Sequence, residues 1–302
     1  MLLGSNFLKF IFLKGKDGQS CLIFRISHVQ YDGLCLPALL LQLGELYGGK
    51  EVPKSPPFST YVYHMVRETV PASIPYWRKL LQGSTMTVLT ANPSVAKSTV
   101  ACSVSKWIPI AGRSKETTIG SLMTAAWAVV LARFLSIGDV TFGKLIAARS
   151  VDIPDCDKIM GMCDQKIPVR IKFEHGWTGK DLLRCVQEQH ISSAPFESVD
   201  IAEIIKNCVD WPTDTYFDSI VHHHDIQYFD TMRFGETSCR LDTMNPHPEP
   251  AGEWKIESYS QGDQLCLQIV SSDAWKDMAM ERLADLADAI TRLTQSPDSP
   301  VL

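Results

Sequence analysis

A histidine, an aspartate and a glycine stand close together near the start of the chain. His28 precedes Asp32 and Gly33 in the stretch SHVQYDG, residues 27–33. A chain of this composition contains His-x-x-x-Asp by chance about 0.6 times, but His-x-x-x-Asp-Gly only about 0.03 times. Imidazole exchanges protons near neutral pH, so His28 is a candidate to deprotonate an amine or alcohol, or to stabilise charge on it. Asp32 would polarise the imidazole or pair with a cation, and Gly33 would permit a sharp turn.

The pattern around this motif predicts a strand before it and a helix after it. Residues 7–13 and 21–26 are apolar and flank the turn signal at 15–18, which predicts a β-hairpin. Residues 34–47 are dense in leucine and end at two glycines, which predicts a mostly buried helix. A polar turn between such elements is a common place for reactive groups. The alternative is that the His and the Asp only stabilise the turn.

The rest of the chain mixes helical and strand patterns, which predicts an α/β fold. Residues 83–99 are rich in Ser, Thr and small residues, and we interpret them as a linker between two lobes, 1–95 and 96–302. We expect a helix at 61–81 that is interrupted near Pro71 and Pro75. The other expected elements are strands at 104–110, 139–146, 167–173 and 219–225, a hairpin at 254–269, and helices at 119–134, 178–189 and 280–293.

Composition excludes several classes of protein. The 302 residues carry a net charge of −5, and 45 % of them are hydrophobic, which is typical of a globular protein. No cluster of basic residues predicts a nucleic-acid partner. No stretch predicts a membrane span or an export signal, so we expect a cytoplasmic protein without a membrane partner. The nine cysteines contain no Cys-x-x-Cys, which indicates reduced, mostly buried thiols.

Three consecutive histidines, 222–224, are followed by Asp225 and raise the question of a metal site. On a strand only His222 and His224 face the same way, and a site needs a third ligand at a suitable distance. We therefore favour a strand that faces solvent or a polar channel, and expect no metal. The motifs of nucleotide hydrolases, dehydrogenases, zincins and α/β-hydrolases are all absent.

Five ordered segments resemble the condensation domains of nonribosomal peptide synthetases. The stretch FRISHVQYDG at 24–33 is similar to their active-site motif. Ser27 stands where the family usually has a second His, as in the terminal condensation-like domains of fungal synthetases. The remaining similar segments are 58–62 with 76–77, 140–149, 161–170 and 189–197.

The sequence departs from the family pattern in three places within these segments. Asp164 and the two residues after it stand where the family has apolar residues around an Asn. Met162 replaces a usual Pro, and Ala147-Ala148 precedes Arg149 where Ser-Gly is common.

The resemblance implies a fold of the chloramphenicol acetyltransferase kind, with two lobes and the active site in a tunnel between them. It implies that His28 is the catalytic histidine. Asp32 would pair with Arg149 and hold the active-site segments in register, and Ser27 and Gly33 would be structural. Residues 1–95 would be the remnant of an incomplete first lobe, and 96–302 the second lobe.

The resemblance also implies the reaction and its partner. A carrier protein would present a peptidyl thioester on phosphopantetheine, and an amine would attack it to form an amide, as a terminal cyclisation or release step. No tightly bound cofactor is expected.

Two alternatives remain open. One is a non-catalytic remnant that binds a carrier protein or a partner lobe. The other is a coenzyme A-dependent acyltransferase of the same fold, although the Asp-Phe-Gly-Trp-Gly motif of plant-type members is absent.

Overall fold

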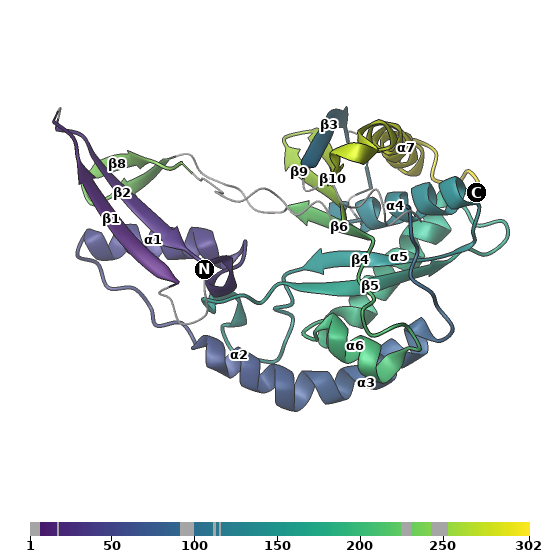
Figure 1. The fold of residues 1–302 in the computed structure, drawn as a ribbon, viewed down its shortest axis with the longest axis horizontal. Helices are drawn as coiled ribbons and strands as arrows, with labels where there is room; N and C mark the ends of the chain where they lie inside the picture. The colour runs from purple at the N-terminus through teal and green to yellow at the C-terminus, as the bar shows by residue number, and fades with distance from the viewer. Residues whose placement is uncertain are drawn as a thin grey trace. The chain divides into compact units, whose positions relative to one another are not determined.

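The structure is a computed structural model that describes residues 7–16, 18–90, 100–110, 113–114, 116–224, 231–242 and 253–302 (Figure 1). The chain forms two compact units. So far as they are described, the first consists of Met1–His64, Ala147–Asp164 and Tyr228–Asp242, and the second of Met65–Ile146, Gln165–Gln227 and Thr243–Leu302. The boundary expected after residue 95 lies outside the described residues and stays a prediction.

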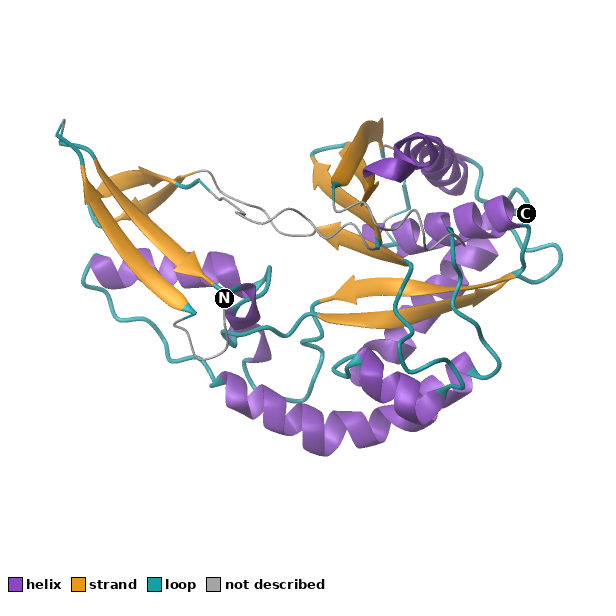
Figure 2. Cartoon of the chain, viewed as in Figure 1, coloured by secondary structure: helices purple, strands orange, loops and turns teal. Residues whose placement is uncertain are grey.

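A six-stranded sheet organises the second unit (Figure 2). Strand β6 pairs in parallel with both β4 and β9, and the other pairings are antiparallel. The hairpin and the four single strands expected from the sequence are all present, with ends shifted by a few residues. In spatial order the strands are β3 (Ala101–Pro109), β10 (Gln264–Ser272), β9 (Trp254–Gln261), β6 (Ser219–His224), β4 (Asp139–Ile146) and β5 (Gln165–Lys172).

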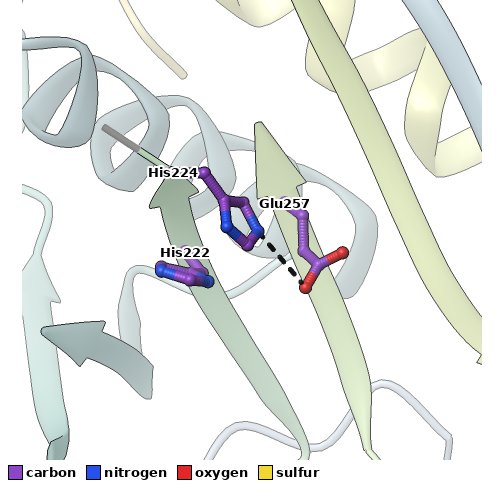
Figure 3. Close-up of side chains that lie close together, drawn as sticks. All are labelled: His222, His224 and Glu257. Atoms are coloured by element: carbon purple, nitrogen blue, oxygen red, sulfur yellow. Dashed lines mark ion pairs between the residues drawn. The ribbon is translucent and has the colours of Figure 1, made fainter. Parts of the chain in front are cut away.

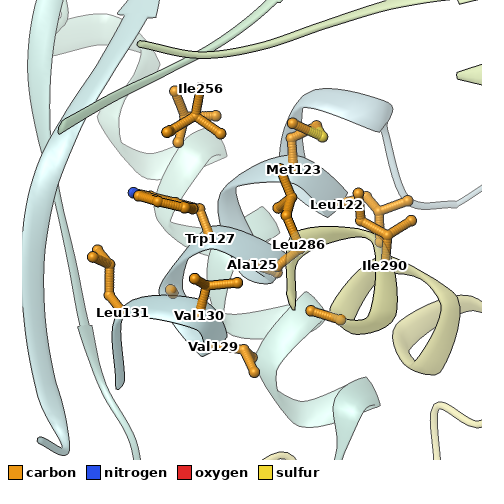
Figure 4. Close-up of a cluster of buried hydrophobic side chains, with 14 of the residues drawn as sticks. Leu122, Met123, Ala125, Trp127, Val129, Val130, Leu131, Ile256, Leu286 and Ile290 are labelled. Atoms are coloured by element: carbon orange, nitrogen blue, oxygen red, sulfur yellow. The ribbon is translucent and has the colours of Figure 1, made fainter. Parts of the chain in front are cut away.

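The main core of this unit forms around helix α4 (Ile119–Leu135). Thr118 caps the helix, because its hydroxyl accepts a hydrogen bond from the backbone N–H of Ser121. Residues 121–132 are all buried. Their side chains pack against Ile256 of β9 and against helix α7 (Lys276–Gln295), as Figure 4 shows. Helix α5 (Gly179–Ser193) also contacts α4.

A second core forms where helix α3 (Val70–Leu81) packs on α6 (Ile201–Cys208). The expected interruption near Pro71 and Pro75 is wrong, because α3 runs through both residues. Pro71 directly follows the first residue of α3, and Pro75 lies inside the helix. The irregular segment lies earlier, as a π-helical turn at Met65–Thr69 that follows α2 (Phe58–His64).

The first unit contains the predicted hairpin, formed by β1 (Leu8–Lys14) and β2 (Ser20–Ile26). It also contains the pair β7 (Thr231–Phe234) and β8 (Thr237–Arg240). Helix α1 (Cys35–Tyr47) contacts β7, and only Cys35 and Gly44 of the helix are buried. The prediction of a mostly buried helix is therefore wrong. A helix rich in leucine has apolar surface that can be buried. That surface becomes buried only where another element packs against it.

Short 3-10 turns complete the described elements. They are η1 (His28–Gln30), η3 (Cys156–Lys158), η4 (Ala194–Phe196) and η5 (Asp273–Trp275). Among the described residues, the helices lack the combination of length and hydropathy that crossing a bilayer requires.

Candidate active site around His28 and Asp32

Asp32 is a fully buried carboxylate at the turn between η1 and α1. Its Oδ1 accepts a hydrogen bond from the backbone N–H of Cys35 at 2.8 Å, which satisfies a donor in the first turn of α1. Its Oδ2 accepts from the backbone N–H of Cys163 at 3.0 Å. One side chain thus joins the start of α1 to a segment more than a hundred residues later in the chain.

The guanidinium of Arg149 completes the shell around this carboxylate. Nη2 of Arg149 lies 2.5 Å from Oδ2 of Asp32, and the two side chains are 6 % and 0 % exposed. Nη1 donates to the carbonyls of Cys156 and Ile159, both at 2.9 Å, and Nη2 also donates to Gly161 at 3.3 Å. Burial would lower the pKa of Arg149, but the hydrogen bond and charge of Asp32 outweigh burial and raise it. The structure therefore brings together Asp32 and Arg149, whose pairing the family resemblance implies.

The residue before Arg149 is in a strained conformation. Ala148 has a φ of 44°, in the left-handed region that disfavours residues with a Cβ. In the family pattern that the sequence resembles, a glycine is common at the position of Ala148. A glycine adopts this positive φ without strain. The carbonyl of Ala148 accepts from the hydroxyl of the buried Tyr61 at 2.9 Å, and the same hydroxyl lies 3.3 Å from the carbonyl of Cys163. Tyr61 thus holds the segments on both sides of the ion pair.

His28 lies at the start of η1 with its side chain exposed. Its ring stacks on that of Tyr31, with centroids 4.6 Å apart and an angle of 25° between the planes. The carbonyl of Ser27 accepts from the N–H of Gln30 at 3.0 Å, so Ser27 shapes the turn through its backbone. His28 is therefore held in place by local contacts and remains accessible to a substrate.

Asp164 is a site residue that we missed from the sequence. Burial, and then the charge of Asp32, raise the pKa of its carboxyl to about 6. Arg149, the backbone N–H of Gly33 and His28 favour the charged form of Asp164, but less strongly. A carboxyl near His28 that exchanges its proton close to neutral pH is a candidate functional group. The only signal in the sequence was a polar residue where the family pattern is apolar.

The thiols near the ion pair are not activated nucleophiles. Burial raises the pKa of Cys163 to about 12, and burial also raises the pKa of Cys35. Both thiols therefore stay protonated at neutral pH. Cys35 and Cys163 are buried, whereas His28 is exposed.

A second group of polar side chains lies on the sheet of the second unit (Figure 3). His222 and His224 come from β6 and Glu257 from the neighbouring β9. Nε2 of His224 lies 3.6 Å from Oε1 of Glu257. Burial, and then the charge of His224, lower the pKa of His222 to about 4. Glu257 is the third possible metal ligand, which the sequence did not reveal. Asp225, which follows the three histidines in the sequence, lies outside the described residues.

The family model described as the condensation domain matches residues 4–301. The chain belongs to the condensation domain family. This domain is 48 % identical over 301 residues to nonribosomal peptide synthetase 1 of Ajellomyces capsulatus. It is 41 % identical over 297 residues to nonribosomal peptide synthetase 6 of Cochliobolus heterostrophus. These alignments cover 99 % and 97 % of this chain, but the chain spans only 16 % and 17 % of those two proteins.

Solved condensation domains share the fold of this chain. A crystal structure described as a CT mutant superposes with a TM-score of 0.89 at 24 % identity, covering 99 % of this chain and 69 % of that one. The starter condensation domain of rhizomide synthetase RzmA gives 0.74 at 15 % identity, covering 98 % and 71 %. The α/β fold expected from the resemblance is confirmed. The incomplete first lobe stays a prediction, as do the roles of His28, Ser27, Asp32, Gly33 and Arg149.

Proposed function

We propose that this condensation domain forms an amide bond by transferring a peptidyl group from a thioester to an amine. The thioester would be carried on the phosphopantetheine of a carrier protein, and the step would be a terminal cyclisation or release in the cytoplasm. The observation that carries the proposal is the exposed His28 beside the turn that the buried Asp32–Arg149 pair holds. Membership of the condensation domain family supports it.

In this proposal His28 acts on the attacking amine, either as a general base or by stabilising the charge that forms. The amine nitrogen bonds to the thioester carbon, and the imidazole takes a proton from it or stabilises the tetrahedral intermediate. The C–S bond then breaks, and the thiolate receives the proton. A thioester is already an activated acyl group, so positioning and proton transfer can supply the rate without a bound cofactor.

Asp32 would be a positioning residue in this reaction. The guanidinium of Arg149 and the N–H groups of Cys35 and Cys163 already bind its two oxygens. Its carboxylate is thereby committed to holding α1 and the 161–164 segment, which supports a structural role over one in polarising the imidazole. Ser27 and Gly33 would shape the turn that presents His28.

The test uses a peptidyl thioester on a carrier protein or on a small thiol, with amide product followed by mass spectrometry. His28→Ala should lower the rate by roughly 10²–10⁴-fold, as loss of a general base does. His175→Ala, at an exposed histidine of the second unit, is the matched control and should keep full activity. Full product formation by His28→Ala would overturn the assignment of His28.

A second candidate is binding without catalysis, which the exposed apolar side chains of the first unit favour. Phe10 and Phe12 on β1 are 53 % and 66 % exposed. Here the domain would bind a carrier protein or a partner lobe and form no product with any thioester. The remaining candidate, coenzyme A-dependent transfer, would give product from acetyl-coenzyme A with no carrier protein present.

A further inference from the structure

The sheet of the second unit brings two imidazoles and a carboxylate together. Side chains alternate between the faces of a strand, so His222 and His224 of β6 lie on one face and His223 on the other. In the parallel pairing of β6 with β9, His222 is directly opposite Glu257. The register of the sheet thus supplies the third group that the local sequence lacks.

The ligand atoms of these three residues are close enough for one ion. One nitrogen of each histidine and one carboxylate oxygen all lie within 4.8 Å of one another. The two rings have centroids 3.9 Å apart, and the three side chains lie close together on the neighbouring strands β6 and β9 (Figure 3). Bonds of about 2.0–2.2 Å to a tetrahedral ion would separate the ligand atoms by roughly 3.4 Å. His224 and Glu257, at 3.6 Å, are already near that spacing, and His222 lies within 4.8 Å of both.

The partial exposure of these side chains and the carboxylate of Glu257 suit a cation, whereas one nearby lysine opposes it. His224 and Glu257 are 25 % and 22 % exposed, so an ion could enter from solvent and still lose part of its water. Lys255 is the cationic side chain on the same face of β9, and it acts against a metal ion there. A simple ion pair between His224 and Glu257 would explain their contact but would not require His222.

We propose that His222, His224 and Glu257 bind a divalent first-row transition-metal ion of the Zn²⁺ class. Two imidazoles and one carboxylate are a ligand set that such ions accept, with a further position left for water or another ligand. Within the described part of the chain, this is the one group of three such side chains that could hold an ion. The site belongs to the second unit and is independent of the reaction proposed for His28.

The experiment is a titration of the untagged protein, first stripped with a chelator and desalted, with Zn²⁺ in a calorimeter. One equivalent should bind with a dissociation constant in the micromolar range or below, and Mg²⁺ should not compete. Co²⁺ should give the visible absorption of a site with fewer than six ligands. Thermal unfolding with and without Zn²⁺ should show an upward shift of Tm.

Three single variants and one matched control separate this site from adventitious binding. His222→Ala, His224→Ala and the isosteric Glu257→Gln should each weaken Zn²⁺ binding by more than the ~10–100-fold that changes outside the ligand shell cost. His223→Ala is the control on the same strand, since His223 contacts Ser258 on the opposite face, and it should leave the affinity unchanged.

Several results would overturn the proposal. One is the absence of binding at micromolar Zn²⁺. Another is an equivalent of Zn²⁺ that binds His222→Ala and Glu257→Gln as tightly as the wild type. A loss of affinity in His223→Ala as large as in the ligand variants would also assign the ion to another place. Circular dichroism of each variant checks that it is folded.

Discussion

At the scale of single residues, the buried ion pair between Asp32 and Arg149 is the main structural device of the candidate site. It replaces water around two charges by hydrogen bonds to three carbonyls and two backbone N–H groups. Such a pair is costly to break, because the partner that remains is a buried charge without compensation. The resemblance to condensation domains predicted the pair, and the structure adds the backbone groups that it holds.

We predict that Arg149→Ala lowers the free energy of unfolding by about 3–5 kcal/mol, measured by urea denaturation. The control is Lys158→Ala in the same unit. Lys158 pairs with Asp155 at 2.6 Å, but these side chains are 52 % and 56 % exposed, so Lys158→Ala should lower the stability far less than Arg149→Ala does. Equal losses in the two variants would mean that the Asp32–Arg149 pair does not stabilise the site.

Asp164 makes the stability depend on pH in a defined direction. Its folded pKa of about 6 is above the ordinary value of 3.8, so the folded state holds this proton more tightly than the unfolded chain does. The resulting stabilisation is complete below about pH 4 and is lost as the pH rises to 6. Asp164→Asn does not titrate. We therefore predict that its free energy of unfolding, relative to the wild type, increases between pH 4 and pH 7. Urea denaturation across this range measures it, and parallel curves would contradict the prediction.

At the scale of elements, close packing between α2 and the 161–164 segment sets the position of the ion pair. A Cβ placed on Gly161 would lie 2.2 Å from Cδ2 of Phe58. The carbonyl of Gly161 also accepts hydrogen bonds from Arg149 and from the thiol of Cys35. Gly161 does not have a positive φ, so its backbone conformation does not require glycine. Glycine is needed at this position because a Cβ would overlap the ring of Phe58.

We predict that Gly161→Ala costs about 1–3 kcal/mol of stability through overpacking. In a Phe58→Ala background the same change should cost clearly less, since the clashing ring is gone. Gly138→Ala is the control, because a Cβ there meets nothing within 4 Å. Additive effects of the changes at 161 and 58 would show that the two residues do not meet.

At the scale of the whole molecule, burial is distributed unevenly between the two units. Helix α4 and strands β9 and β10 form a continuous core in the second unit. The β1–β2 hairpin of the first unit has no buried residue in either strand. Backbone hydrogen bonds without buried side chains around them open more easily.

We predict that hydrogen exchange, followed by mass spectrometry, is slow in α4, β10 and α7 and fast in β1 and β2. The difference should persist at temperatures well below global unfolding. Comparable protection of the hairpin would mean that another chain or segment covers its apolar side chains under the conditions of the experiment.

Local patterns in the amino-acid sequence were sufficient to predict most of the elements and the family. Period-two and helical patterns placed the hairpin, the sheet strands and α4, because these patterns depend on neighbours a few residues away. Five ordered segments, of which the motif around His28 is one, together identified the family. Local patterns erred at α1, where burial depends on partners, and at Pro71 and Pro75, which α3 accommodates after a π-helical turn.

The contacts between groups far apart along the chain became known from the three-dimensional fold. Asp164 lies near His28, and the N–H of Cys163 donates to the carboxylate of Asp32, although more than a hundred residues separate each pair along the chain. Glu257 meets His222 because β9 is the neighbour of β6. The contact of Glu257 with His222 follows from strand order and register, which long-range packing selects, and no periodicity along the chain encodes any of these contacts.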